Sequence, residues 1–411
     1  MIFSKQPKTI WIINQYASTP EYGYAGRSFY FAKELASKGH KVYLITASYT
    51  HLLIKPPTVS ENFTVQDING FKLVWVKMPE YATAHDKKRI LNWFLFSHKI
   101  KQLPTILKCA PDAIMYSSPS LVGYLGAKKL AKKCKAKLIL DIRDIWPLTL
   151  IKIGNISPYH PFICLLSFIE KKAYLGSDVV VSNLKYAVKH MTSLGMNPNK
   201  FTWIPNGVDL NEVEKPEPLP QVYLDQFPQN RFIVGYTGTF GLANDISTLI
   251  AAAALIQQKD SDISFVLIGS GREKEELKQG IQSLGLKNVT LLDPISKKQV
   301  QTALHHFDVL WVGAKKTDLY DFGVSPNKLF EYLFAQKPII YSIESGDFKP
   351  ILEHNCGVQT PAENPHALAE AILHLKQLPV STRNQLGANG LNAAQTNYTY
   401  QNLTNKLEKL L

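Results

Sequence analysis

One short segment shows how most of this chain is built: Val266-Leu267-Ile268-Gly269-Ser270-Gly271-Arg272. A run of apolar residues typical of a buried strand leads into a glycine turn, and a charge-rich segment typical of a helix follows. The same alternation of strand and helix recurs in both directions from this segment. Strands that alternate with helices predict parallel βαβ units, so we expect an α/β fold with doubly wound sheets.

The strand-like segments form two sets. The first set comprises Ile10–Asn14, Lys41–Thr46, Phe71–Lys77, Ala113–Tyr116, Leu138–Asp141 and Asp178–Ser182. The second set comprises Phe201–Ile204, Phe232–Tyr236, Ser264–Ile268, Val289–Leu292, Val309–Val312 and Pro338–Tyr341. We therefore predict two Rossmann-like domains facing a cleft, residues 1–198 and 199–393. A final helix within 394–411 is expected to return to the first domain.

Composition narrows the class of protein. The 411 residues carry a net charge of +13 and are 45% hydrophobic, which is ordinary for a globular protein apart from the excess of positive charge. No apolar run reaches the roughly 18 residues of a membrane span, and the N-terminus lacks a signal-peptide pattern. Four scattered cysteines predict neither a zinc site nor a disulfide framework. We expect a cytoplasmic protein with reduced thiols and no bound metal.

The strongest local motif is Gly323-Val324-Ser325-Pro326-Asn327-Lys328-Leu329-Phe330-Glu331-Tyr332. Ser325 suits the cap position of a helix and Pro326 its first turn. The free N–H groups and the positive dipole end of such a helix can hold a diphosphate, with Lys328 adding charge. Glu331, further along, could accept hydrogen bonds from ribose hydroxyls. An ordinary capped helix explains the same residues equally well.

Glycine turns follow two strands of the second half. One carries Gly269 and Gly271 before Arg272, and the other carries Gly238 and Thr239. Glycine lets a backbone approach a ligand closely, although a tight turn alone accounts for each motif. Together with the helix start at Ser325, all at carboxyl ends of strands, these turns indicate a nucleotide pocket.

Two segments of the first half are candidate site elements. The loop Tyr22–Ser28 contains Gly23 and Arg27, which could reach phosphate oxygens or belong to an ordinary loop. The strand 137–140 ends in Asp141-Ile142-Arg143-Asp144, and charges at such a position are costly unless paired or used. Asp144 is our preferred catalytic or substrate-orienting carboxylate, whereas Arg143 could serve a structural ion pair.

The positive charge gathers in two places. In residues 87–99, Lys, Arg and His flank an apolar centre. This pattern suits contact with an anionic membrane surface, although a core helix with solvated ends has the same pattern. Residues 128–137 contain six lysines and are typical of a solvated helix face. No nucleic-acid-binding module is recognisable, so nucleic acid is not an expected partner.

Taken together, these motifs resemble those of GT-B glycosyltransferases of family 4, and the resemblance covers almost the whole chain. The matching segments are Gly23–Gly39, Ile204–Asp209, the two glycine turns and residues 322–338. The Ser-Pro-Asn-Lys run and the Asp-x-Arg-Asp-x-Trp-Pro run resemble a subgroup of bacterial O-antigen and capsule enzymes, the fucosamine (N-acetylaminosugar) transferases.

The resemblance implies a retaining, metal-independent transfer from an NDP-sugar, without a cofactor, to a glycan or lipid-linked acceptor at the inner face of the plasma membrane. It implies that Glu331 binds the donor ribose, that Val324–Lys328 receive the diphosphate and the sugar, and that Gly269–Gly271 lie near the base. A UDP-linked N-acetylaminosugar is the expected donor. A nucleotide-sugar 2-epimerase and a non-catalytic nucleotide-sugar binding protein remain the alternative functions.

The chain departs from the family pattern at two places. Gly323 stands where the first of two glutamates is usual, with Asp321 the nearest carboxylate. The usual cations for the diphosphate are absent after the first glycine turn, where Thr239 and Asn244 stand. We expect Lys328, together with Arg272, to replace them.

Overall fold

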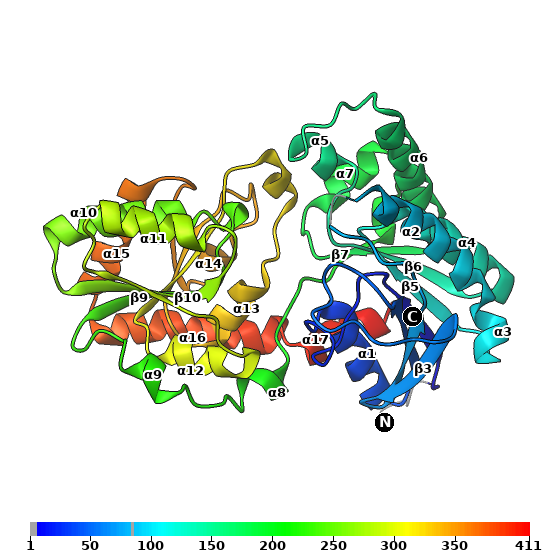
Figure 1. Cartoon of the computed structure of the whole chain (residues 1–411), viewed down its shortest axis with the longest axis horizontal. Helices are drawn as coiled ribbons and strands as arrows, with labels where there is room; N and C mark the ends of the chain where they lie inside the picture. The colour runs from blue at the N-terminus through cyan, green and yellow to red at the C-terminus, as the bar shows by residue number, and fades with distance from the viewer. Residues whose placement is uncertain (1–5, 84–85) are drawn as a thin grey trace. The chain divides into compact units, whose positions relative to one another are not determined.

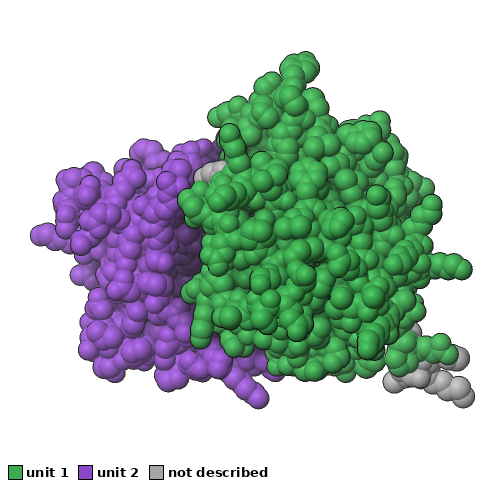
Figure 2. All heavy atoms as spheres, turned by 45° about the vertical axis from the view of Figure 1, so that its right-hand side comes forward, with its two compact units in different colours: residues 1–205, 403–411 green, residues 206–402 purple. Residues whose placement is uncertain are grey.

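The computed structural model describes residues 6–83 and 86–411. Within them the chain forms two compact units, one made of residues up to Pro205 together with Leu403–Leu411, and one made of Asn206–Asn402. Figure 2 colours these two units separately. The chain thus leaves unit 1 after Pro205 and re-enters it with its last residues.

The part of unit 1 that the structure describes contains an eight-stranded sheet in the order β3-β4-β2-β1-β5-β6-β7-β8. Its strands are β1 (Thr9–Ile13), β2 (Lys41–Ala47), β3 (Phe63–Ile68), β4 (Phe71–Val76), β5 (Ala113–Ser117), β6 (Lys137–Ile142), β7 (Val179–Ser182) and β8 (Phe201–Trp203). All neighbouring pairs are parallel except β3 with β4. The central strands are continuous apolar runs because helices cover both of their faces.

The helices of unit 1 lie on the two faces of this sheet (Figure 1). They are α1 (Arg27–Ser37), α2 (Lys87–Lys99), α3 (Leu103–Leu107), α4 (Leu121–Cys134), α5 (Leu148–Lys152), α6 (Pro161–Gly176), α7 (Ala187–Ser193) and the end of α17 (Tyr400–Glu408). Helix α1 packs against β2 and β4, whereas α4 packs against β5 and β6 and lies between α2 and α6. Right-handed crossovers on either side of β1 place these helices on opposite faces.

Unit 2 has a six-stranded parallel sheet among its described residues, in the order β11-β10-β9-β12-β13-β14. Its strands are β9 (Phe232–Thr239), β10 (Ile263–Ser270), β11 (Val289–Leu292), β12 (Val309–Gly313), β13 (Ile339–Ser342) and β14 (Gly357–Gln359). Its helices are α8 (Leu210–Val213), α9 (Gln221–Leu224), α10 (Ile246–Lys259), α11 (Lys274–Ser283), α12 (Val300–His305), α13 (Asn327–Phe334), α14 (Pro350–Glu353), α15 (Pro365–Gln377), α16 (Val380–Asn397) and the start of α17. Both units are therefore doubly wound α/β sheets.

Two elements differ from the sequence-based expectation. Residues 201–203, expected to open the second domain, form β8 and pair in parallel with β7 of unit 1. The joint therefore falls at Pro205–Asn206, because this short strand completes the edge of the first sheet. The antiparallel strand β3 was not expected, since its burial alternates with exposure and its apolar pattern is weak.

Candidate active site

A pocket of about 490 Å³ opens at the carboxyl ends of the strands of unit 2. Its lining comes from the end of β9 and the turn that follows it, the end of β10, the loop after β11 with the start of α12, and the first turns of α13. The lining residues are Thr237, Gly238, Thr239, Asn244, Ile268, Gly269, Ser270, Pro294, Ile295, Val300, Pro326, Asn327, Lys328 and Glu331. This volume lies within the range of small-ligand sites, and this edge is where open parallel sheets bind ligands.

Lys328 is the central cation of this pocket. Its Nζ donates to the Tyr236 hydroxyl at 2.6 Å and to Asn244 Oδ1 at 2.9 Å. The same Nζ lies 4.1 Å from the centre of the Tyr236 ring, a cation–π distance. Desolvation by burial lowers the pKa of Lys328 to about 7, and Glu331 opposes that shift. An anion entering the pocket would stabilise the charged form and raise this pKa.

Glu331 lies one helical turn beyond Lys328, on the side of α13 that faces the pocket. Its carboxylate forms an ion pair with Lys297, and its backbone carbonyl accepts from Gln301 Nε2 at 3.0 Å. Glu331 is largely buried, while Lys297 is half-exposed. The pair holds the carboxylate at the pocket wall, next to the loop that carries Pro294 and Ile295.

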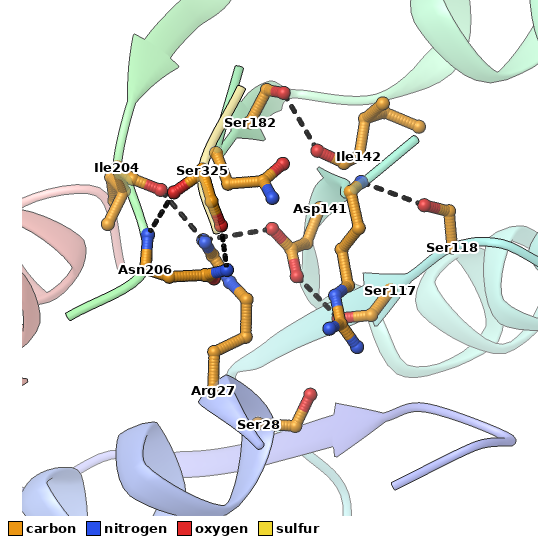
Figure 3. Close-up of polar contacts among 12 residues, drawn as sticks. Arg27, Ser28, Ser117, Ser118, Asp141, Ile142, Ser182, Ile204, Asn206 and Ser325 are labelled. Carbon is orange, nitrogen blue, oxygen red and sulfur yellow. Dashed lines mark hydrogen bonds and ion pairs between the residues drawn. The ribbon is translucent and has the colours of Figure 1, made fainter. Parts of the chain in front are cut away.

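Ser325 does not have the capping role expected of it. Helix α13 begins at Asn327, with Pro326 at the cap position and no side-chain capping bond. The Ser325 hydroxyl instead accepts from the backbone N–H of Asn206 at 2.9 Å, and its carbonyl accepts from Asn206 Nδ2 at 2.8 Å. These two bonds fix the turn before the helix (Figure 3). The first N–H groups of α13 therefore remain available, as at any helix start.

The glycine turns are required first of all by packing. A Cβ at Gly269 would lie 1.9 Å from the carbonyl oxygen of Gly238, so β9 and β10 could not approach as they do. Gly238 has φ +141° and leaves room for Lys328, whose Nζ would be 3.2 Å from an added Cβ. Both glycines line the pocket, whereas Gly271, Val324 and Ser325 are not among its lining residues.

Arg272 was expected to replace a lost cation near the diphosphate. It is exposed and is not among the residues that line the pocket. Within this pocket the positive charge comes instead from Lys328, with Lys297 at the edge beside Glu331.

Arg27 is used inside unit 1, and the structure gives no support to its predicted contact with phosphate. Its Nη2 lies 3.1 Å from Asp141 Oδ1, with both side chains fully buried, and its Nη1 donates to the Ile204 carbonyl at 2.9 Å. Ser117 Oγ donates to the other Asp141 oxygen at 2.7 Å. Figure 3 shows this group around the end of β6. The pair explains why a carboxylate stands in a buried strand.

Asp144, the preferred catalytic carboxylate, follows β6 in unit 1. Its side chain reaches solvent. The surrounding protein nevertheless raises its pKa, and neighbouring Arg143 opposes that shift. Gly23, the other predicted residue of unit 1, packs against Ser18, whose Oγ would be 2.8 Å from an added Cβ. The backbone N–H of Gly23 donates to the Thr19 carbonyl at 3.0 Å.

Some residues that line the pocket, or that contact Lys328 and Glu331 in it, were not singled out by the sequence. Tyr236, whose hydroxyl accepts a hydrogen bond from Lys328, lies inside a strand whose other residues have the apolar pattern of a buried strand. Lys297, Pro294 and Ile295 follow β11, and their position after a parallel strand of the same sheet was the available signal. In residues 6–83 and 86–411, no group of three or more His, Cys, Asp or Glu side chains is arranged to hold a metal. No helix in the described part of the chain has the length and hydropathy needed to cross a membrane.

Two doubly wound units, one with a pocket lined by a helix start, a lysine and a carboxylate, define the GT-B class of glycosyltransferases. The chain is similar along 98% of its length to sucrose-phosphate synthase from Thermosynechococcus elongatus, with a TM-score of 0.74 at 16% identity and 98% of that chain covered. It is also similar to HepE of Anabaena in complex with UDP and glucose, with a TM-score of 0.67, 14% identity and coverage of 98% and 99%. These likenesses show the fold.

The family follows from the sequence itself. The model of Glycosyltransferase Family 4 matches residues 27–212, and that of glycosyl transferases group 1 matches residues 225–393. The chain belongs to the GT-B glycosyltransferases of the family 4 type, and it is a glycosyltransferase. It is 24% identical over 318 residues to WcaI of Escherichia coli strain K12, a putative colanic acid biosynthesis glycosyl transferase. That similarity covers 73% of this chain and 74% of the relative.

Proposed function

We propose that this glycosyltransferase moves a sugar from a UDP-linked N-acetylaminosugar to a glycan or lipid-linked acceptor in bacterial surface polysaccharide synthesis. The transfer retains the anomeric configuration and uses no metal. The observation that carries the proposal is the single pocket wall shared by the start of α13, Lys328 and Glu331. The similarity to WcaI supports the polysaccharide, and the similarity to HepE, solved with UDP, supports the nucleotide.

The pocket supports one placement of the donor. The diphosphate lies against the N–H groups of Asn327 and Lys328, where the helix dipole favours negative charge. The ribose hydroxyls donate to the Glu331 carboxylate, which shares its charge with Lys297. The base lies beside the turn at Gly269, which lines the pocket.

The chemistry that we propose is a displacement at the anomeric carbon. The bond from that carbon to the diphosphate oxygen breaks, and the acceptor oxygen bonds to the carbon on the same face. The leaving diphosphate gains negative charge, which protonated Lys328 and the helix start stabilise. The proton of the acceptor hydroxyl passes to the leaving diphosphate. Asp144 of unit 1 is proposed to orient the acceptor hydroxyl.

The acceptor of the sugar that we propose is a glycan carried on a lipid. Such an acceptor places the enzyme at the inner face of the plasma membrane as a peripheral protein. The basic and aromatic helix α2, residues 87–99, supports this location, since its ends carry lysines and its exposed side chains include Leu91 and Phe94.

The experiment measures binding and turnover with the purified chain. Thermal unfolding in the presence of UDP-sugars should show a stabilisation of about 2.7 kcal/mol when the ligand is at roughly 100 times Kd. With donor and a membrane extract or synthetic glycan acceptor, proton NMR should show a product that keeps the donor's anomeric configuration. EDTA should leave the rate unchanged.

Three results would contradict the proposal. An inverted product would exclude retention. Epimerisation of the donor without any acceptor would assign the chain to the nucleotide-sugar 2-epimerases. Stabilisation by donors without turnover under any condition would leave a nucleotide-sugar binding protein.

A further inference from the structure

Unit 1 has a pocket of its own at the carboxyl end of β4, with a volume of about 780 Å³. Its walls come from the segment before β3, the segment after β4, and helices α2 and α3. Three charged residues line it: Glu61 before β3, Lys77 directly after β4, and Lys99 in the last turn of α2. The volume lies within the range of small-ligand sites. We call it the unit 1 pocket.

Two ammonium groups line the unit 1 pocket, and neutral oxygens hold both of them. Lys99 Nζ donates to Asn62 Oδ1 at 3.0 Å and to the backbone carbonyl of Lys77 at 2.8 Å. Lys77 Nζ donates to the backbone carbonyl of Ser60 at 3.0 Å. An ammonium group has three N–H donors, so these contacts leave one donor on Lys99 and two on Lys77.

The two positive charges also act on each other. Burial lowers the pKa of Lys99, and the charge of Lys77 lowers it further. An anion between the two groups would oppose both effects, because it stabilises the charged form of each lysine. Lys328 of unit 2 is held by neutral oxygens in the same way. The unit 1 pocket is therefore suited to an anionic ligand.

The balance of charge in the lining indicates how many charges this anion carries. The ionisable side chains of the lining are Lys77, Lys99 and Glu61, so two positive charges and one negative charge leave a net charge of +1. A carboxylate carries one negative charge, whereas a phosphate monoester carries nearly two at neutral pH. A carboxylate therefore matches this lining better. Glu61 is an acceptor and can take hydrogen bonds from hydroxyl groups of the same ligand.

The remainder of the lining is partly apolar. Met78, Leu95 and Ile106 belong to it, and Ile106 is 43% exposed. Apolar side chains beside a few polar groups are typical of small-molecule sites. A sugar ring suits this lining, since its C–H faces are apolar and its hydroxyl groups lie at the rim. The aromatic residue of the lining, Phe63, is buried, so the pocket presents no ring on which a nucleotide base could stack.

Hydrogen bonds fix the segment after β4 that forms one wall of the pocket. The backbone N–H of Met78 donates to Ser48 Oγ at 3.0 Å, in the loop after β2. The carbonyl of Pro79 accepts from Asn92 Nδ2 of α2 at 2.7 Å. Because this wall is already attached to the sheet and to α2, little conformational entropy is lost when a ligand binds.

We propose that the unit 1 pocket binds a carboxylated sugar unit, a uronic acid residue, of the acceptor glycan. The carboxylate accepts from the remaining N–H donors of Lys77 and Lys99, and hydroxyl groups of the ring donate to Glu61. The face of the ring packs on Met78 and Leu95. This inference deepens the proposed function and rests on it, since it names the chemical class of the acceptor.

The unit 1 pocket lies away from Asp144, which is proposed to orient the acceptor hydroxyl. Lys77 follows β4 and Asp144 follows β6, and β2, β1 and β5 lie between these strands. Four strand spacings of about 4.8 Å separate the two strand ends by roughly 19 Å along one edge of the sheet. The uronic acid is therefore a unit further back in the acceptor chain than the sugar that receives the new bond.

The test is saturation-transfer NMR of the full chain with two probes that differ in one group, methyl β-D-glucuronide and methyl β-D-glucoside. We expect the glucuronide to bind at least about 10-fold more tightly, because charge-assisted hydrogen bonds to the carboxylate are lost in the glucoside. Lys99→Gln should weaken glucuronide binding about 10-fold. Lys77→Gln, at a more exposed site, should weaken it up to about fivefold, and Glu61→Gln should tighten it by a similar factor.

The matched control is Lys88→Gln, because Lys88 is an exposed lysine of the same helix α2 that does not line the pocket. It should bind the glucuronide as the unaltered chain does. Equal binding of the two probes would overturn the proposal, as would equal glucuronide binding by Lys77→Gln, Lys99→Gln and Lys88→Gln. Competition by acetate or inorganic phosphate as strong as that by the glucuronide would show an ion site without recognition of a sugar, and would overturn it too.

Two further measurements keep the result interpretable. Thermal unfolding checks that each variant folds, and exposed Lys77→Gln carries the test if Lys99→Gln does not. UDP-sugar binding by the same variants separates this proposal from the proposed function. Its loss from every form of the chain contradicts the proposed function and leaves the glucuronide result intact.

Discussion

Arg27 in unit 1, which is fully buried, and Lys328 in unit 2, which is partly buried, were both expected to bind phosphate, and the structure gives them different surroundings. Arg27 is paired with Asp141 at 3.1 Å and has no exposed surface. Lys328 is held by neutral oxygens of Tyr236 and Asn244 and lines an open pocket. A buried cation with its own carboxylate is a structural element, whereas one held by neutral groups can accept an anionic ligand. The group that pairs with the cation thus decides whether the cation is structural or can bind an anionic ligand.

The largest effect on stability is expected from breaking the buried ion pair between Arg27 and Asp141. Arg27→Met leaves the Asp141 carboxylate buried without its cation, which should cost about 3–5 kcal/mol in the free energy of unfolding. Urea unfolding followed by circular dichroism measures it. Lys38→Met is the control, because Lys38 pairs with Glu408 at a partly exposed site and should cost at most about 1 kcal/mol. A loss from Arg27→Met as small as that of the control would contradict the structural role.

The next effect is on catalysis. Lys328→Met should lower the rate of sugar transfer by about 10²–10³-fold, because a group that stabilises charge in the transition state is removed. Steady-state kinetics with a UDP-sugar measures the change. Lys278→Met, on the exposed side of α11, is the matched control and should keep full activity. Full activity of Lys328→Met would remove Lys328 from the mechanism.

The third effect is on the pH dependence of nucleotide binding. With a pKa of about 7, Lys328 is half-protonated at neutral pH in the free protein. A diphosphate binds the charged form, so the affinity for a UDP-sugar, whose diphosphate diester does not titrate in this range, should be constant below pH 7 and fall about tenfold per pH unit above it. Calorimetry in buffers of different ionisation enthalpy should show proton uptake at pH 8. The same profile in Lys328→Met would assign the titration to another group.

The smallest effect concerns the ion pair at the pocket edge. Lys297 is half-exposed and shares the Glu331 carboxylate that the ribose is proposed to use. Lys297→Met should therefore tighten UDP binding by no more than about fivefold, the worth of an exposed ion pair. Lys298→Met is the control, since Lys298 pairs with Glu217 instead. Weaker binding would mean that Lys297 itself contacts the nucleotide.

The sequence predicted most of the fold, because continuous apolar strands and helical spacing are local signals. It failed at residues 201–203, where a strand of the expected kind pairs with the first sheet, which no local pattern reveals. The pocket around Lys328, Glu331 and Gly269 was predicted from motifs at strand ends. The ion-pair partner of each charged side chain was not predicted, because Arg27 and Asp141 are far apart in the sequence, as are Lys297 and Glu331.

Tyr332, buried on the inner side of α13, has a consequence for how the pocket responds to a ligand. Its hydroxyl accepts from the backbone N–H of Thr237 at 2.7 Å and donates to the carbonyl of the same residue at 3.2 Å. These two hydrogen bonds join the helix that carries Lys328 to the strand end that carries Gly238. Because the two walls are already joined, little conformational entropy is lost in assembling them around a ligand. The Thr237 amide should accordingly rank among the slowest to exchange with deuterium, with or without nucleotide.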